Sequence, residues 1–342
     1  MASTPLAHIN ELARLAAKAG RFPPAAQVAL MYRQYARFDR LVAARLTDRD
    51  QTLFGMPGAC LDAFRQNRKL GGFNVFHAVN AHPLAHNAAL LEQHETETVR
   101  GELIPDGAAA RVSEELETAD MVLSPSQSNT AGLVRFGVPS EKIATVGYGV
   151  DLARFDVSLG SDATPDGAEP IRLLFVGQIS FRKGVDTLIS AMRALADNFL
   201  LTMAGPIVSP SVLLDVPANV RICGSVSQEH LAHLYNEADV LVLPSVEDAC
   251  ALVTFEAAAT GLPVITTREN GASEYLNRRA LMLVRSADAG SLASALGSVT
   301  KLSLDVKLQN RADLLETRQV VDWAEYAERV MKRVTESGTV HR

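Results

Sequence analysis

The stretch from residue 241 to residue 274 constrains the fold of this chain most strongly. An apolar run, 240–243, stops at a Pro-Ser pair, which is the pattern of a short buried strand. A helical pattern begins near Leu252, and the β-branched run 264–267 follows a Gly-Leu-Pro break. The order strand, helix, strand predicts a βαβ crossover, and therefore an α/β fold with parallel strands.

This crossover carries two acidic residues at informative places. Asp248 follows the first strand directly, and Glu256 lies in the helix that comes next. Open α/β sheets bind their ligands at the edge formed by the carboxyl ends of the strands. We therefore expect both carboxylates to face a ligand.

Composition limits the class of protein. With 342 residues, 47% of them hydrophobic and 21% charged, the chain is long enough for two α/β domains. A net charge of −6 argues against a general nucleic-acid binder, which needs a basic face. The three cysteines lack metal-ligand spacing and fit a reducing cytoplasm. No apolar run reaches the roughly 18 to 20 residues of a membrane span, so we expect a cytoplasmic protein.

The first 49 residues are basic, with eight Arg or Lys against three acids. Within them, residues 26–46 form a predicted amphipathic helix with Arg33, Arg37 and Arg40 on one side. The predicted apolar side consists of Val28, Met31, Tyr35, Phe38, Val42 and Leu46. The helix either lays its cations against anionic lipid headgroups, as a peripheral contact at the inner membrane, or packs on a sheet with a solvated basic face.

One histidine lies at a predicted strand end. The strand 73–79 runs into Asn-Ala-His-Pro, which places His82 at a carboxyl edge. The histidine is either a ligand contact or a structural or solvated side chain. His86 follows four residues later, but no third ligand has matching spacing, so we predict no metal site.

A cationic loop opens the second half of the chain. The predicted strand 171–176 is followed by a loop with Arg182 and Lys183 and then by a predicted helix, 185–196. Two cations beside a helix N-terminus form an anion site that suits a phosphate group. The alternative is an ordinary surface pair of cations. Before this half, residues 157–170 contain almost nothing that can pack, and we interpret them as an interdomain linker.

Five motifs together resemble glycosyltransferase family 4. They are VGQISFRKG at 176–184, AGP at 204–206, ADVLVLPS at 238–245, EAAATGLPV at 256–264 and NGASE at 270–274. The likeness covers roughly residues 50 to 326 and is strongest after residue 111. It implies the GT-B fold, two Rossmann-like domains facing a cleft. It also implies transfer of a sugar from a UDP- or GDP-sugar with retention of configuration, without a metal and with no cofactor besides the donor.

The resemblance assigns roles to individual side chains. Lys183 resembles the lysine that binds the donor diphosphate, and Glu256 the glutamate that accepts hydrogen bonds from the ribose hydroxyls. Asp248 matches a glutamate that contacts the donor sugar, and is one methylene shorter. Gln178 stands where the family commonly has an arginine, so we expect Arg182 to replace that charge. His82 aligns loosely with a histidine that touches the donor sugar.

Backbone groups complete the implied donor site. Gly177, Gly205 and Gly224 are expected near the nucleotide. The amides of Ala249, Cys250, Ala251 and Leu252 match a loop, often Gly-Phe-Gly-Leu, that contacts phosphate and sugar. Alanines in place of both glycines restrict the backbone and add methyl groups, so we predict a narrower donor pocket. Cys250 has no neighbouring base in sequence and is interpreted as pocket lining.

The predicted domains follow from these matches. An N-terminal, acceptor-side domain spans 1–156, the linker 157–170, the donor domain 171–318, and a final helix that crosses back 319–342. The family usually begins with a strand and a glycine-rich turn, and neither pattern is present before Leu6. We therefore expect a shortened N-terminal domain.

Two functions remain open on the sequence alone. The first is a retaining glycosyltransferase acting on a lipid-linked, polysaccharide or small-molecule acceptor. The second is a weakly active or inactive nucleotide-sugar-binding partner protein.

Overall fold

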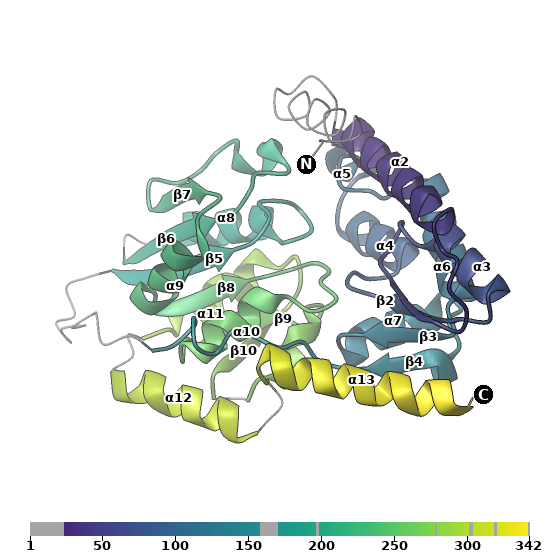
Figure 1. Cartoon of the computed structure of the whole chain (residues 1–342). Helices are drawn as coiled ribbons and strands as arrows, with labels where there is room; N and C mark the ends of the chain where they lie inside the picture. The colour runs from purple at the N-terminus through teal and green to yellow at the C-terminus, as the bar shows by residue number, and fades with distance from the viewer. Residues whose placement is uncertain are drawn as a thin grey trace, which may run out of the picture.

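The computed structural model describes residues 24–157, 170–195, 198–277, 279–300, 304–317 and 320–340 of the chain. Two parallel β-sheets lie side by side, each with helices packed around it (Figure 1). The first sheet contains β1 (Thr52–Gly55), β2 (Phe73–His77), β3 (Met121–Ser124) and β4 (Ile143–Thr145). The second contains β5 (Ile171–Val176), β6 (Phe199–Ala204), β7 (Val220–Gly224), β8 (Val240–Leu243), β9 (Val264–Thr267) and β10 (Leu281–Val284). The predicted α/β fold with parallel strands is confirmed.

The first sheet has its strands in chain order, β1-β2-β3-β4. Its helices are α2 (Pro24–Ala43), α3 (Leu61–Lys69), α4 (Pro83–Gln93), α5 (Thr96–Val99), α6 (Asp106–Thr118) and α7 (Gln127–Arg135). One side of the sheet shares a core with α3 and α6. The other side packs on α13 (Trp323–Val340), whose Val330 and Val334 meet Val75 and Leu123. The last helix of the chain thus supports the first sheet.

The second sheet has the order β10-β9-β8-β5-β6-β7. Its helices are α8 (Val185–Ala194), α9 (Gln228–Glu237), α10 (Leu252–Ala259), α11 (Ala289–Gly297) and α12 (Leu304–Glu316), with short 3-10 turns η2 (Pro210–Leu213) and η3 (Gly271–Tyr275). A third such turn, η1 (Ser140–Lys142), precedes β4 in the first sheet. From β5 the chain adds strands in one direction and from β8 in the other, so the order reverses between these two neighbours. Doubly wound sheets bind ligands at the carboxyl ends of strands at such a reversal.

The predicted apolar side of the N-terminal helix is wrong in its middle part, since Val28, Val42 and Leu46 are half-buried but the three residues between them are exposed. In α2 the side chains of Met31, Tyr35 and Phe38 are 39%, 39% and 60% exposed, whereas Asp39 is completely buried. The Asp39 carboxylate accepts the backbone amides of Asp62 at 2.6 Å and of Ala63 at 2.9 Å, at the start of α3. It also pairs with the Arg111 guanidinium. Because this buried carboxylate caps α3, α2 presents the side that carries Asp39 to the interior. Hydrophobic periodicity does not indicate that orientation of α2.

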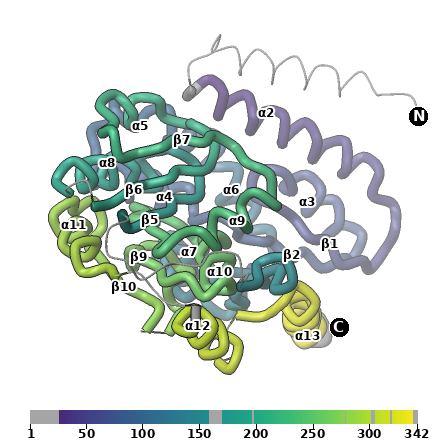
Figure 2. Tube along the Cα trace, turned by 90° about the vertical axis from the view of Figure 1, so that its left-hand side faces the viewer, coloured from purple at the N-terminus to yellow at the C-terminus, as the bar shows by residue number. Residues whose placement is uncertain are grey.

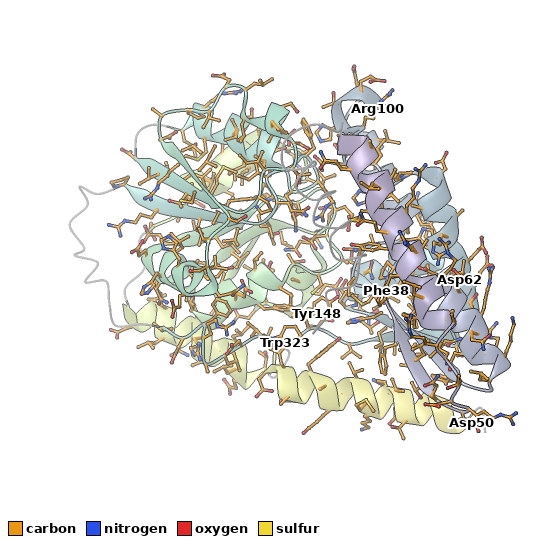
Figure 3. The ribbon with its side chains drawn as sticks, turned by 45° about the horizontal axis from the view of Figure 1, so that its top comes forward. Phe38, Asp50, Asp62, Arg100, Tyr148 and Trp323 are labelled. Carbon is orange, nitrogen blue, oxygen red and sulfur yellow. The ribbon has the colours of Figure 1, made fainter. Side chains whose placement is uncertain are left out.

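The outer position of α2 is clear from a second direction. In Figure 2 it runs along one edge of the molecule, with α3 beneath it and α12 and α13 at the opposite end. Figure 3 labels Phe38 beside α2. No helix in the described ranges is both long and apolar enough to span a membrane. The predicted linker falls largely on 158–169, and the missing first strand on residues before 24, which lie outside the described residues.

Candidate active site

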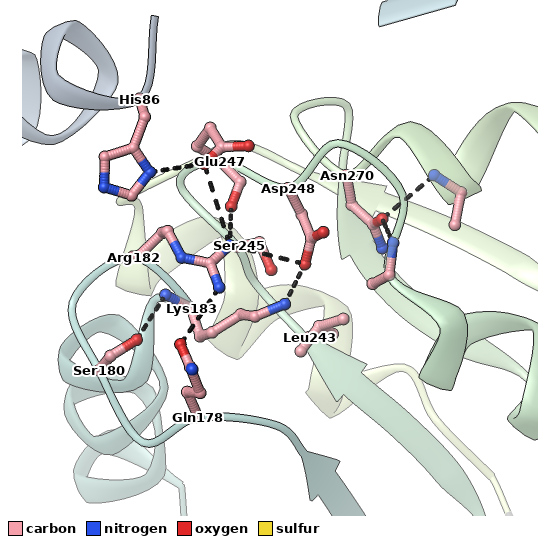
Figure 4. Close-up of polar contacts among 12 residues, drawn as sticks. His86, Gln178, Ser180, Arg182, Lys183, Leu243, Ser245, Glu247, Asp248 and Asn270 are labelled. Atoms are coloured by element: carbon pink, nitrogen blue, oxygen red, sulfur yellow. Dashed lines mark hydrogen bonds and ion pairs between the residues drawn. The ribbon is translucent and has the colours of Figure 1, made fainter. Parts of the chain in front are cut away.

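The two loops at the reversal point bring the predicted charged residues together. Lys183 comes from the loop after β5, and Asp248 from the loop after β8. The Lys183 ammonium forms an ion pair and a hydrogen bond with the Asp248 carboxylate (Figure 4). Strand order therefore joins two side chains that are 65 residues apart in sequence.

Lys183 is a buried cation. Its residue is only 8% exposed. Burial lowers the pKa of the Lys183 ammonium below its ordinary value, and Asp248 opposes that shift. A buried charge needs a partner or a ligand of opposite sign. In this conformation the partner is Asp248, the residue expected to contact the donor sugar.

Arg182 lies beside this pair. Its guanidinium donates to the Glu247 carbonyl oxygen at 3.0 Å and to Gln178 Oε1 at 3.3 Å. It also lies 4.0 Å from Asp248 Oδ2. The guanidinium thus lies next to Gln178, and its expected replacement of the family's arginine stays a prediction.

The loop between β8 and α10 is packed tightly. Ala249, Cys250 and Ala251 are each about 5% exposed, while Leu252 is 36% exposed. The amide of Ala251 donates to Asn270 Oδ1 at 3.1 Å, so that amide is already satisfied. Burial raises the pKa of the Cys250 thiol well above its ordinary value, which favours a neutral lining residue over a nucleophile.

Asn270 is an organising residue that sequence reasoning missed. It is completely buried, and its side chain binds the Ala251 amide, Thr254 and Thr266. These contacts connect the loop at 249–252 to strand β9 and helix α10. The NGASE motif marked Asn270 in the sequence. Its hydrogen-bond partners, however, come from a loop, a helix and a strand, and no sequence spacing connects them.

Glu256 lies on α10 with one oxygen engaged. The Tyr235 hydroxyl donates to Glu256 Oε2 at 2.7 Å. Glu256 Oε1 makes no hydrogen bond within the described residues. Burial raises the pKa of the Glu256 carboxyl above its ordinary value, although the hydrogen bond from Tyr235 and the charge of Arg154 oppose this. The carboxylate is therefore held by a tyrosine and keeps a free acceptor.

The three predicted glycines meet at neighbouring strand ends. The Gly177 nitrogen donates to Ala204 O at 2.9 Å, and the Gly205 nitrogen to Gly224 O at 2.8 Å. Gly205 has a φ of 145°, and a Cβ built on it would lie 1.8 Å from the Gly177 carbonyl oxygen. Only glycine fits where two backbone segments approach each other this closely. Half-buried backbone without side chains thus lies at the edge of the second sheet.

His82 has structural contacts on both ring nitrogens. Nδ1 accepts the Leu84 amide at 3.2 Å, and Nε2 lies 3.4 Å from Ser113 Oγ. The ring stacks on Phe136 with centroids 5.1 Å apart. Burial lowers the pKa of His82 and keeps the imidazole neutral. Its predicted contact with a donor sugar stays a prediction, and within the described ranges no group of three possible metal ligands includes it.

His86 and Glu102 carry contacts that no motif indicated. His86 Nδ1 lies 3.0 Å from Glu247 Oε2, and Nε2 lies 2.9 Å from Glu102 O. The Glu102 carboxylate accepts the backbone amides of Phe181 at 2.8 Å and Arg182 at 2.9 Å. These bonds fasten the first half of the molecule to the loop that carries Lys183.

A second carboxylate makes the reciprocal contact. Glu274, beyond β9, accepts the amides of Gln127 at 2.8 Å and Ser128 at 2.6 Å, at the N-terminus of α7. The Ser126 hydroxyl donates to the Ala249 carbonyl at 2.7 Å. Each half thus presents a glutamate to backbone amides of the other, an arrangement that favours anionic groups. Together the contacts hold the loops of the two sheets close to each other.

Part of the chain is similar to proteins of a known family. Residues 170–301 match the profile of the family described as glycosyl transferases group 1. A D-inositol 3-phosphate glycosyltransferase of Catenulispora acidiphila is 30% identical over 57% of this chain and 52% of that protein. The chain thus spans about half the length of such curated relatives.

Solved structures resemble most of the described fold. Sucrose-phosphate synthase from Thermosynechococcus elongatus aligns with a TM-score of 0.70 at 19% identity, over 89% of this chain and 77% of that one. Anabaena HepE, solved with UDP-glucose, aligns with a TM-score of 0.64 at 14% identity, over 91% and 82%. These likenesses show the fold. Residues 170–301 carry the match to the group 1 glycosyl transferases, and the described fold is the GT-B fold of these solved structures.

Proposed function

We propose that the protein is a retaining glycosyltransferase that transfers a sugar from a UDP- or GDP-sugar to an acceptor hydroxyl. One observation carries this proposal: a buried ammonium, Lys183, at the order reversal of the second sheet, with Arg182 beside it. A solved neighbour of the same fold, HepE, binds UDP-glucose, which supports a nucleoside diphosphate sugar as the donor.

The proposal gives each charged residue a role that its position supports. Lys183 and Arg182 stabilise the negative charge that develops on the diphosphate as the glycosidic bond breaks, an effect that a closed cleft strengthens. The acceptor oxygen forms the new bond to the anomeric carbon, and its proton leaves with the diphosphate oxygen. Because protein cations neutralise the leaving group, we propose that no metal is needed.

Two acids position the donor in this proposal. The free oxygen of Glu256 suits a ribose hydroxyl, since a carboxylate accepts hydrogen bonds readily. When the diphosphate binds, the Lys183 ammonium pairs with the phosphate oxygens instead of Asp248. The Asp248 carboxylate is then available to accept hydrogen bonds from the sugar hydroxyls. The glycines at 177, 205 and 224 leave space for the nucleotide at the sheet edge.

Donor binding is tested by thermal stability across a panel of UDP-, GDP- and ADP-sugars. A ligand at about 100 times its dissociation constant adds roughly 2.7 kcal/mol to the free energy of unfolding. We expect Lys183→Ala and Glu256→Ala each to remove most of this gain. Lys142→Ala is the matched control, because Lys142 binds carbonyl oxygens of the first half at 117 and 119. Gains that persist in both site variants would place the donor elsewhere.

Catalysis is tested separately, because an inactive nucleotide-sugar-binding protein would also bind the donor. We expect consumption of the donor in the presence of an acceptor, and a product whose anomeric configuration, read by NMR, equals that of the donor. Activity is expected to persist with EDTA. Tight donor binding without transfer or donor hydrolysis would favour the binding protein.

We also propose that α2 contacts an anionic membrane surface. Arg33, Arg37 and Arg40 are exposed on the same helix as the exposed side chains of Met31 and Phe38. Cations mixed with apolar groups suit headgroups and the acyl boundary beneath them. Co-sedimentation with phosphatidylserine vesicles should be strong at low salt and weak at high salt. Equal binding of Arg37→Gln would contradict this contact.

A further inference from the structure

A cavity of about 320 Å³ lies between the two halves of the molecule. Helix α2 forms one wall through Val28 and Met31, and the loops of the second sheet form another through Gln178 and Arg182. Protein interiors are packed densely and contain few voids larger than a water molecule. A hollow of this size that reaches the proposed diphosphate site is therefore suited to a ligand.

The two ends of the cavity differ in chemistry. Toward the first sheet it is lined by the apolar side chains of Val112, Leu116 and Leu133, each at most 3% exposed. They belong to the core between this sheet and its helices. These apolar walls stabilise apolar surface removed from water, while Tyr32, Asn80 and His82 also line the cavity and offer partners for a hydroxyl group.

The other end is polar and charged. It is lined by His86, Glu102, Arg182 and Glu247. Figure 4 shows Arg182 between Glu247 and Lys183, so this end borders the proposed leaving-group site. A ligand that fills the cavity would present its polar end to the reaction and its apolar end to the core.

We propose that this cavity binds the apolar body of the acceptor, and that the acceptor is an alcohol with a compact aliphatic or aromatic portion next to its reactive hydroxyl. The inference rests on the proposed function, since it names the acceptor of that reaction. The volume is at the lower end of small-molecule sites, so it accommodates one such group and not a stretch of polysaccharide. Because Met31 is both exposed and part of the wall, α2 provides the entrance.

The experiment measures binding of methyl, butyl and hexyl β-D-glucoside by calorimetry, with saturating nucleoside diphosphate present. In the wild type, each added methylene should tighten binding by up to about fourfold, from roughly 0.8 kcal/mol per buried methylene. Met31→Gln, and independently Val28→Gln, should flatten this dependence on chain length. Phe38→Gln is the control, since Phe38 is on the same helix, is 60% exposed and does not line the cavity.

The possible outcomes separate this inference from the proposed function. The inference is overturned if the affinity for the glucosides does not change with alkyl chain length. It is also overturned if Met31→Gln and Phe38→Gln have equal effects, even when diphosphate binding depends on Lys183. Chain-length dependence that Met31→Gln removes supports the apolar cavity. If binding depends on chain length in this way but no nucleoside diphosphate binds, the cavity is an apolar ligand site and the glycosyltransferase proposal fails.

Discussion

The carboxylate of Glu102 accepts the backbone amide of Arg182 at 2.9 Å, across the boundary between the two sheets. The same carboxylate binds the Phe181 amide and the Ser209 hydroxyl. Three donors from the second half thus converge on one charged group of the first half. This contact holds the loop of Lys183 against the first half, together with the other contacts that join the two halves.

Glu102→Gln should therefore weaken both stability and donor binding. An amide keeps only one acceptor oxygen, and hydrogen bonds to a charged group contribute about 1.5 to 3 kcal/mol. We expect a loss of about that size in urea unfolding and a higher KM for the donor. Glu97→Gln is the control, because Glu97 is exposed and pairs with Arg100, a residue of the same half. Equal effects of the two substitutions would contradict a special role for Glu102.

Asp248→Asn should separate diphosphate binding from sugar binding. Removing the carboxylate frees the Lys183 ammonium from its present partner, so the nucleoside diphosphate should bind at least as tightly as in the wild type. The advantage of the nucleotide sugar over the bare diphosphate should fall by about tenfold, as a charge-assisted hydrogen bond is lost. Calorimetry with both ligands measures this ratio. Asp215→Asn, at an exposed residue paired with Arg193, should leave it unchanged.

Tyr235→Phe should reduce the recognition of ribose. Without the hydroxyl that donates to Glu256 Oε2, the carboxylate is no longer held toward the ligand. We expect the preference for a ribonucleotide over its 2′-deoxy form to fall several-fold. A loss of general stability alone would leave this preference intact, so the ratio distinguishes positioning from folding. Glu256→Gln should reduce the same ratio.

Much of the second half could be predicted from the sequence. The strands 171–176, 240–243 and 264–267 begin and end as expected, because buried parallel strands are short apolar runs between turn residues. That Lys183 and Asp248 both follow strands could be predicted, whereas their contact depends on β5 and β8 being neighbours, which the structure shows. The roles of these residues toward a donor stay predictions.

The interdomain contacts could not be predicted. Glu102 and His86 find partners 80 and 161 residues away, and neither contact has a local pattern. The face of α2 was misjudged because Asp39, a charged residue, occupies the buried side. Hydrophobic periodicity assigns charged residues to the surface. It therefore predicts the wrong buried side for a helix whose buried residue is a capping carboxylate.

Glu247 should make stability depend on pH. Burial raises the pKa of this carboxyl, but the hydrogen bond from His86 and the charges of Arg182 and Lys183 outweigh burial, and the pKa lies below its ordinary value of 4.5. The folded state then binds fewer protons than the unfolded state, so the contribution is present above about pH 4.5 and is lost as pH falls through the folded pKa. The stability difference between wild type and Glu247→Gln should shrink from pH 7 to pH 3. A constant difference would contradict this link.

Tyr148→Phe should stabilise the nucleotide-free protein. Tyr148 lies between the two halves (Figure 3) and is 7% exposed, and its hydroxyl has no hydrogen-bond partner within the described residues. A buried polar group without a partner costs about 1 to 3 kcal/mol, so its removal should raise the melting temperature. Tyr326→Phe is the matched control with the opposite sign, because the Tyr326 hydroxyl lies 3.1 Å from His77 Nε2. If the free hydroxyl serves a ligand, Tyr148→Phe should also weaken donor binding while it raises stability. A variant that is less stable than the wild type would show that the hydroxyl has a partner.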